Sequence, residues 1–242
     1  MAKFNTNSNA YTIIYATVIV VIVAFLLAIV SSALKPKQQA NIQLDTRKQI
    51  LSSLNLDLKG QDIDALYEKT IKPDTLGFVK DKAGKDVPQI VYLATLADGS
   101  QKFIIPMRGA GLWGAIWGYV ALNDDKNTIF GTYFNHDSET PGLGGEITTA
   151  KFQNGFNGKH VLSNGVLKAL EIVKGEPNDE QVAAISGATI TSKGVETMIN
   201  GTLEQYKDFL TAQASLQTEQ NQETEPAVLP ADSTVSEPSD VK

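Results

Sequence analysis

The sequence has no cysteine among its 242 residues and only two histidines, His136 and His160. The lack of cysteine excludes disulfides, thiol chemistry and cysteine-ligated iron–sulfur clusters in this chain. Two histidines are too few for a histidine-rich metal site, so we expect no metal ligands. Any redox centre is therefore predicted to be an organic cofactor or to belong to a partner.

The chain also has fewer basic than acidic residues. Lysine and arginine number 21 against 27 aspartates and glutamates, which gives a net charge of −6, and the basic residues are scattered. Proteins that bind nucleic acids gather basic residues in patches, so we expect no nucleic-acid partner. With 42% hydrophobic residues, the chain can bury one sizeable core with extensions, or two small cores.

The N-terminal part carries a long apolar run. A short polar segment at residues 1–10 precedes it, and no charged side chain occurs between Lys3 and Lys35. Because ~20 apolar residues match the ~30 Å hydrocarbon core of a bilayer, we predict a transmembrane helix at residues 11–34, ended by Pro36. The alternative is a signal peptide cleaved near residues 31–33, although its apolar region would exceed the usual length of about 7–15 residues.

The charges around this span leave its orientation open. Lys3 precedes the span, whereas Lys35, Lys37, Arg47 and Lys48 follow it. By the positive-inside rule, this count would place the larger C-terminal part in the cytoplasm. With a single span and so few flanking charges, the positive-inside rule does not decide the orientation.

Residues 35–212 are typical of one α+β domain with mostly antiparallel strands flanked by helices. Helical spacing occurs in residues 41–56, in a shorter segment near residue 63 and after Ser192. The apolar residues that share one side of the first helix are Ile42, Ile50, Leu51 and Leu54. Strands are predicted at residues 89–96, 103–105, 119–122, 128–134 and 167–173, with turns at residues 81–86 and 98–99.

The last part of the chain differs in composition. From residue 213 onward Gln, Glu, Thr, Ser, Pro and Asp dominate, and the few apolar residues show no period. Such a segment cannot bury enough apolar surface to order itself. We therefore predict a disordered tail at residues 213–242.

Three segments of the domain are candidate sites, and the first is GAGLWG (residues 109–114). It matches the dinucleotide-binding pattern G-x-G-x-x-G, but that fold needs a helix directly afterwards and an acidic residue ~20 positions later. Here the strand-like AIWGYV follows instead. The segment is better interpreted as a glycine-rich turn that presents Leu112 and Trp113 to a planar ring, unless both are simply core residues.

The second segment is HDSETPGLGGE (residues 136–146), which combines His, Asp, Ser and Glu as in a hydrolase. Neighbours in one loop cannot easily form a nucleophile, base and orienting group in relay, and no G-x-S-x-G motif occurs. We interpret the segment as a rigid Pro-Gly loop. Its backbone N–H groups and Leu143 can pack against a ligand.

The third segment, ISGATITS (residues 185–192), lies directly before the last predicted helix. Thr191 or Ser192 is a candidate N-cap, because a hydroxyl oxygen there can accept from a free backbone N–H. A helix N-terminus reached through Gly and Ala also offers N–H donors and space to a phosphate. Thr189 would place a hydroxyl at that phosphate. An ordinary capped helix start is the simpler alternative.

ETPGLG (residues 139–144) followed by SGAT (residues 186–189) resembles the covalent-FMN-binding domains of bacterial respiratory complexes. Within them, the chain is most similar to the C subunits of Na⁺-translocating NADH:quinone reductases. The resemblance spans most of the chain and includes the single anchor, residues 34–41, GLWG (residues 111–114) and the final helix.

This resemblance implies a membrane-anchored electron carrier without a catalytic acid or base. The last threonine of SGAT, here Thr189, would hold FMN through a phosphoester bond, attached by a flavin transferase that uses FAD and Mg²⁺. The domain would lie outside the cytoplasm on the bacterial inner membrane, with the other reductase subunits as partners. The other residues expected at the FMN site are Leu112, Trp113, Thr140, Leu143, Gly144, Ser186, Gly187, Ala188 and Thr191.

One departure concerns attachment of the flavin. The family's transferase motif usually has Asp six residues before the acceptor, where this chain has Ala183. Two alternatives stay open. One is the G subunit of an Rnf-type ferredoxin:NAD⁺ complex or another covalent-FMN carrier, against which the long segment at residues 35–86 speaks. The other is a membrane-anchored protein that binds a non-redox ligand.

Overall fold

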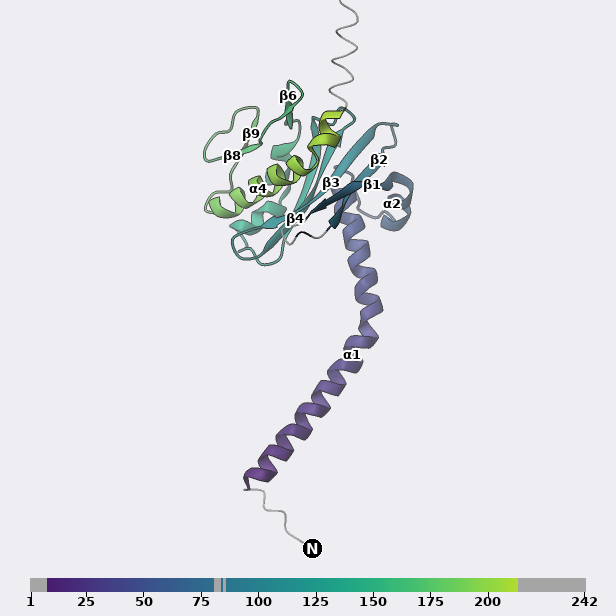
Figure 1. Cartoon of the computed structure of the whole chain (residues 1–242), viewed down its shortest axis with the longest axis vertical. Helices are drawn as coiled ribbons and strands as arrows, with labels where there is room; N and C mark the ends of the chain where they lie inside the picture. The colour runs from purple at the N-terminus through teal and green to yellow at the C-terminus, as the bar shows by residue number, and fades with distance from the viewer. Residues whose placement is uncertain (1–7, 81–83, 85, 213–242) are drawn as a thin grey trace, which may run out of the picture.

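The computed structural model describes residues 8–80, 84 and 86–212. One long helix, α1 (Asn9–Ser52), extends from a domain in which a helix lies across a five-stranded sheet (Figure 1). The tail predicted at residues 213–242 and most of the turn predicted at residues 81–86 fall outside the described residues.

Helix α1 continues through Pro36, so the prediction that Pro36 ends the helix is wrong. Proline removes one backbone N–H and crowds the carbonyl four residues earlier, which bends a helix without ending it when both flanks are helical. Figure 1 shows a bend along α1. Residues 37–51 contain no glycine and no further proline, and they carry the helix into the domain.

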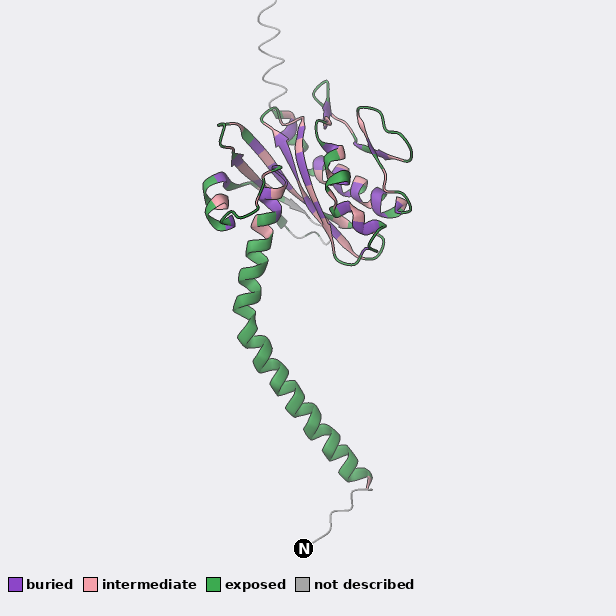
Figure 2. Cartoon of the chain, turned by 180° about the vertical axis from the view of Figure 1, so that it is seen from behind, coloured by how far each residue is buried: buried purple, intermediate pink, exposed green. Residues whose placement is uncertain are grey.

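The N-terminal part of α1 is the candidate membrane span. Among the described residues, α1 is the one helix that is long and apolar enough to cross a bilayer. Its apolar side chains are exposed, and Figure 2 shows α1 uncovered outside the domain. A helix that is apolar on all sides is suited to lipid. This supports the predicted span at residues 11–34, whose limits stay a prediction.

The C-terminal end of α1 belongs to the domain core. Ile50, Leu51 and Leu54 are buried there against one face of the sheet and α2 (Ile63–Thr70). Ile42, which we expected on the same buried side, is 64% exposed, because α1 has already left the domain at that point. The carboxylate of Asp62 caps α2 by accepting from two backbone N–H groups.

Five strands form one antiparallel sheet in which each strand pairs with the next along the chain. They are β1 (Ile71–Lys80), β2 (Asp86–Thr95), β3 (Gln101–Ala110), β4 (Ala115–Asn123) and β5 (Ile129–His136). The first four strands predicted from the sequence correspond to β2 to β5. Strand β1 was not predicted because its start, KPDT (residues 72–75), is polar and contains proline, which an edge strand tolerates.

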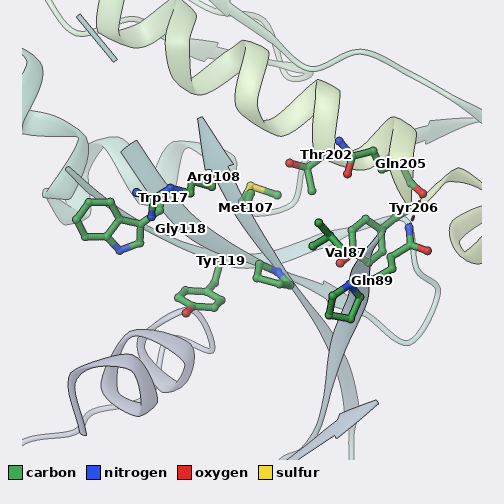
Figure 3. A pocket seen from close by; sticks show the side chains of 12 residues that line it. Val87, Gln89, Met107, Arg108, Trp117, Gly118, Tyr119, Thr202, Gln205 and Tyr206 are labelled. Carbon is green, nitrogen blue, oxygen red and sulfur yellow. Dashed lines mark hydrogen bonds between the residues drawn. The ribbon is translucent and has the colours of Figure 1, made fainter. Parts of the chain in front are cut away.

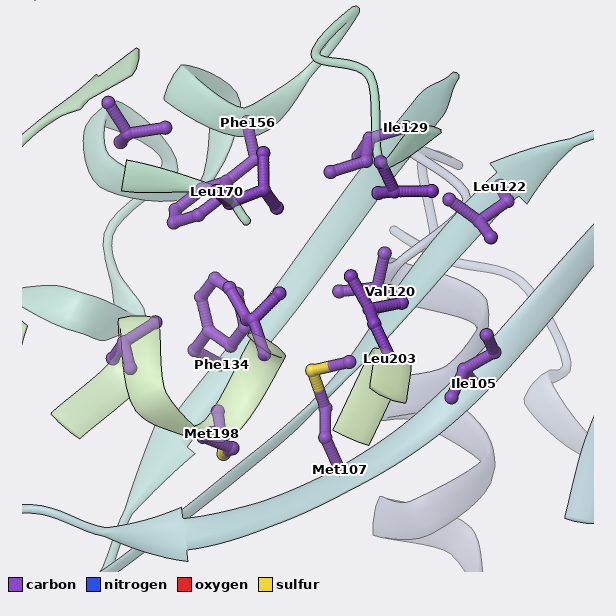
Figure 4. Close-up of a cluster of buried hydrophobic side chains, with 14 of the residues drawn as sticks. Ile105, Met107, Val120, Leu122, Ile129, Phe134, Phe156, Leu170, Met198 and Leu203 are labelled. Atoms are coloured by element: carbon purple, nitrogen blue, oxygen red, sulfur yellow. The ribbon is translucent and has the colours of Figure 1, made fainter. Parts of the chain in front are cut away.

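The other face of the sheet packs against α4 (Thr189–Gln205) and three short helices. These are η1 (Gly144–Thr148), α3 (Ala150–Gln153) and η2 (Asn154–Phe156). Figure 4 shows the resulting core, in which Met198 and Leu203 of α4 meet Met107 and Val120 of the sheet. The rings of Phe134 and Phe156 lie 5.3 Å apart, edge to face. This core fixes the position of α4 on the sheet.

The strand predicted at residues 167–173 is interrupted. The structure has only β7 (Val166–Leu167) and β8 (Glu171–Val173), which pair with β6 (Leu162–Ser163) and β9 (Gln181–Ala183). Between them the backbone of Leu170 pairs with a side chain, since Asn200 of α4 accepts from its N–H and donates to its carbonyl, both at 2.9 Å. The two hydrogen bonds from the Asn200 side chain therefore replace the backbone strand pairing that we expected at Leu170.

Candidate functional site

The fold brings the three candidate segments together. GLWG (residues 111–114) connects β3 to β4, the ETPGLG loop (residues 139–144) follows β5, and the SGAT segment (residues 186–189) ends at the first residue of α4. One side chain links all three segments. It is Glu139, which the sequence patterns did not place among the site residues.

Glu139 is only 4% exposed, and each of its carboxylate oxygens has a partner on a different segment. The backbone N–H of Trp113 donates to Oε1 at 2.9 Å, and the hydroxyl of Thr191 donates to Oε2 at 2.7 Å. The backbone N–H of Glu139 itself donates to Nδ1 of His136 at 3.1 Å. Glu139 therefore joins the two loops to the first turn of α4.

Glycines make room for this carboxylate. A Cβ atom on Gly111 would lie 2.4 Å from Oε1 of Glu139, and one on Gly144 would lie 2.2 Å from Oε2. Both distances are far inside van der Waals contact, so any side chain at either position would displace the carboxylate. One glycine in each sequence motif, Gly111 and Gly144, is thus explained by Glu139. Glycines on both sides of a glutamate were the signal that could have identified it.

Glu139 is ionised at neutral pH. Burial by itself raises its pKa, but hydrogen bonds from the backbone N–H of Trp113 and the hydroxyl of Thr191 outweigh burial and hold the pKa below its ordinary value. The site therefore contains a fixed negative charge.

The start of α4 differs from the sequence prediction. The helix begins at Thr189, and the preceding Ala188 provides no side-chain cap. Neither predicted cap residue caps the helix, because Thr191 donates to Glu139 and the hydroxyl of Ser192 accepts from the N–H of Ile185 at 3.1 Å. Within the described part of the chain, the N–H groups of residues 189–191 have no hydrogen-bond partner.

An apolar surface surrounds this helix start. Trp113 is 69% exposed, and Leu112, Leu143 and Ile190 are exposed as well. Leu143 lies over Gly187, since a Cβ atom there would come within 2.8 Å of it, and Gly187 has a φ of +76° that favours glycine. Free N–H donors beside exposed apolar side chains fit a ligand with a phosphate and a planar ring system, such as FMN.

Of the other predicted residues, Thr140 and Ser186 are exposed, Thr189 is half-buried, and Ala188, Gly144 and Thr191 are buried. Nine of the ten predicted residues thus lie in the three segments that the fold brings together, and the tenth, Thr191, lies in the first turn of α4. Thr191 is inaccessible to a ligand, because its hydroxyl is buried against Glu139.

A separate cleft of about 410 Å³ lies where β2 and β3 diverge. These strands pair only at Tyr92 to Thr95, so β2 and β3 separate beyond that point. Figure 3 shows Arg108 and Trp117 towards one end of the cleft and Val87, Gln89 and Tyr206 towards the other. The cleft touches the later turns of α4 and contains none of the predicted site residues.

Residues 111–204 match the family model of the FMN-binding domain. The match begins at Gly111 and includes the two loops, the SGAT segment and nearly all of α4. The match therefore includes every segment that Glu139 joins.

Similar proteins extend this match to most of the chain. The C subunit of the Na⁺-translocating NADH-quinone reductase from Haemophilus ducreyi is 33% identical over 231 residues, which covers 81% of this chain and 90% of the relative. Its counterpart from Pseudomonas aeruginosa is 30% identical over 239 residues and covers 81% and 92%.

Solved structures agree. The crystal structure of the C subunit from Parabacteroides distasonis has a TM-score of 0.65 at 38% identity and covers 74% of this chain and 97% of that chain. Shewanella oneidensis NqrC, at 24% identity and a TM-score of 0.59, covers 69% and 97% and shares the fold. The α+β fold predicted from the sequence is confirmed, and the chain belongs to the family of C subunits of Na⁺-translocating NADH-quinone reductases.

Proposed function

We propose that this chain is the subunit of the reductase that carries FMN covalently on Thr189 and relays electrons between partner subunits. The observation that carries the proposal is the position of Thr189. It is the first residue of α4, half-buried, beside N–H groups without partners among the described residues and beside exposed apolar side chains. FMN supplies the electron-transfer chemistry, and the protein supplies binding and orientation.

Each segment has a distinct role in this proposal. A phosphate esterified to Thr189 keeps one negative charge, which suits the N–H groups and the positive end of the α4 dipole. Leu112, Trp113 and Leu143 offer an apolar surface to the flavin ring. The backbone of residues 140–144 and 186–188 would lie beside the attachment point. A tethered ring needs no deep pocket, so its redox edge stays accessible to partners.

The proposal also places the domain outside the cytoplasm, anchored in the bacterial inner membrane by residues 11–34. A flavin transferase on that side would then reach Thr189 during maturation. An alkaline phosphatase fused after residue 242 should be active, whereas a reporter that functions only in the cytoplasm should be inactive. The opposite pair of results would contradict this orientation.

A denaturing gel tests covalent attachment directly. Full-length protein made in a host with the transferase should give a band that fluoresces under ultraviolet light, and Thr189→Ala should give an equally abundant dark band. A dark wild-type band with the transferase present would instead favour a protein that does not hold flavin covalently.

A further inference from the structure

We infer that Glu139 is a positioning residue of the flavin site, which acts on the acceptor through Thr191 and on the apolar loop through the backbone of Trp113. The inference rests on the function proposed above. It gives a role to a buried charge that the proposed electron relay does not itself require.

The first argument is geometric. The two oxygens of Glu139 bind groups 26 and 52 residues away in the sequence, one in the β3–β4 loop and one in the first turn of α4. Thr191 is two residues after Thr189 in the same turn. A helix turn is rigid, so holding the hydroxyl of Thr191 also fixes the rotation of α4 that sets the direction of Thr189.

The second argument is packing. Gly111 and Gly144 approach the carboxylate so closely that neither could carry a side chain without moving it. Gly194, one turn further along α4, approaches the carbonyl oxygen of Ala110 in the same way, since its Cβ atom would lie 2.5 Å away. The end of β3 and the start of α4 are therefore held at a fixed separation, with Glu139 between them.

The third argument is charge. Glu139 is a buried anion bonded to the first turn of α4, where the helix dipole is positive and stabilises it. The flavin phosphate is proposed to lie at the same helix end. A fixed negative charge close to a flavin opposes the addition of electrons. Glu139 should therefore lower the reduction potential of the attached flavin as well as hold the site together.

Protein made without the transferase tests the positioning role independently of flavin. In Glu139→Ala, the amide of Trp113 should exchange its hydrogen about tenfold faster, because it loses a charged acceptor, while the amides of the β3–β4 ladder keep their protection. Unchanged exchange at Trp113 would overturn the inference, whatever the flavin content. If Glu139→Ala does not fold, Glu139→Gln has nearly the same volume and should show a smaller increase at the same amide.

Flavin-loaded protein tests the two consequences. Glu139→Gln should raise the midpoint potential of the flavin. Thr191→Val should lower the flavinylated fraction several-fold, and Thr191→Ser, which keeps the hydroxyl, should restore it. Glu146→Gln is the matched control, because Glu146 lies in the next short helix and its side chain bonds to no described residue. A potential unchanged in Glu139→Gln, together with full flavinylation of Thr191→Val, would contradict the inference. Wild-type protein without covalent flavin would contradict the proposed function instead.

Discussion

The hydroxyl of Thr191 lies 2.7 Å from Oε2 of Glu139, and this bond joins two parts of the chain that are 52 residues apart. It replaces the helix-capping role that the sequence suggested for Thr191. Removing the hydroxyl would leave a buried carboxylate oxygen without its donor, which typically costs about 1–3 kcal/mol. Thr191 is therefore a structural partner of Glu139 and not a local cap.

The ionised state of Glu139 predicts a specific dependence of stability on pH. Its folded pKa is lower than the ordinary value of 4.5, so the stabilisation is fully present above about pH 4.5 and is lost as the pH falls through the folded pKa. Urea unfolding of wild type and Glu139→Gln should differ most at pH 7 and converge as the pH falls below 4.5. A difference that stayed constant from pH 7 to pH 3 would show that the charge of Glu139 does not stabilise the fold.

The acceptor itself can be identified by intact mass. Thr189→Ala should fold normally and carry no covalent FMN, because it lacks the hydroxyl proposed to form the ester. Thr189→Ser keeps a hydroxyl and should retain at least part of the flavin. The measured quantity is the mass increment of one FMN less one water, and its survival in Thr189→Ala would show that another residue is the acceptor.

Ala183 tests the departure from the transferase motif. It is exposed at the end of β9, six residues before Thr189, so a carboxylate there meets solvent and disturbs no packing. If attachment in the wild type is incomplete, Ala183→Asp should raise the flavinylated fraction. Ala183→Asn has the same shape without the charge and should not. An equal rise in both variants would mean that the charge is not what the transferase recognises.

Two glycines of α4 form a matched pair. A Cβ atom at Gly201 would meet nothing within 4 Å, whereas one at Gly194 would lie 2.5 Å from a backbone oxygen of β3. Gly201→Ala should therefore stabilise the protein by about 0.5–1 kcal/mol through helix propensity. Gly194→Ala should destabilise it by about 1–3 kcal/mol, because α4 must move away from the sheet. Chemical unfolding of the detergent-solubilised protein measures both, and equal effects would refute the close approach.

Local patterns in the sequence predicted the elements that depend on local physics. β-branched and aromatic residues with turn signals identified β2 to β5, and helical spacing identified α4. The error at residues 167–173 comes from a distant contact, because Leu170 is bonded to Asn200 and not to a strand. The error at Pro36 is local, because helix α1 continues on both sides of the proline.

Part of the candidate site could likewise be predicted from the sequence, and part could not. Its segments could be recognised from glycines and hydroxyls close together in the sequence, and the family resemblance added the choice of Thr189. The role of Glu139 could not be predicted, because its partners are 26 and 52 residues away. The hydroxyl of Thr191 had an equally reasonable local use, and only the folded chain excludes it.

Because α1 is continuous, the number of residues between the predicted span and the domain sets two quantities. These are the distance of the domain from the membrane and its rotation about the helix axis. Leu51 is locked in the core, and the predicted span ends at residue 34, so roughly 25 Å of helix at about 1.5 Å per residue separates the two. Inserting one residue after Pro36 would lift the domain by about 1.5 Å and swing it by about 100° around the helix axis. Inserting seven residues would lift the domain by about 10 Å but return it nearly to its original orientation around the helix axis. The rate of electron transfer to a partner fixed in the membrane would distinguish the two insertions. One residue mainly changes the orientation of the domain, whereas seven residues mainly change its distance from the membrane.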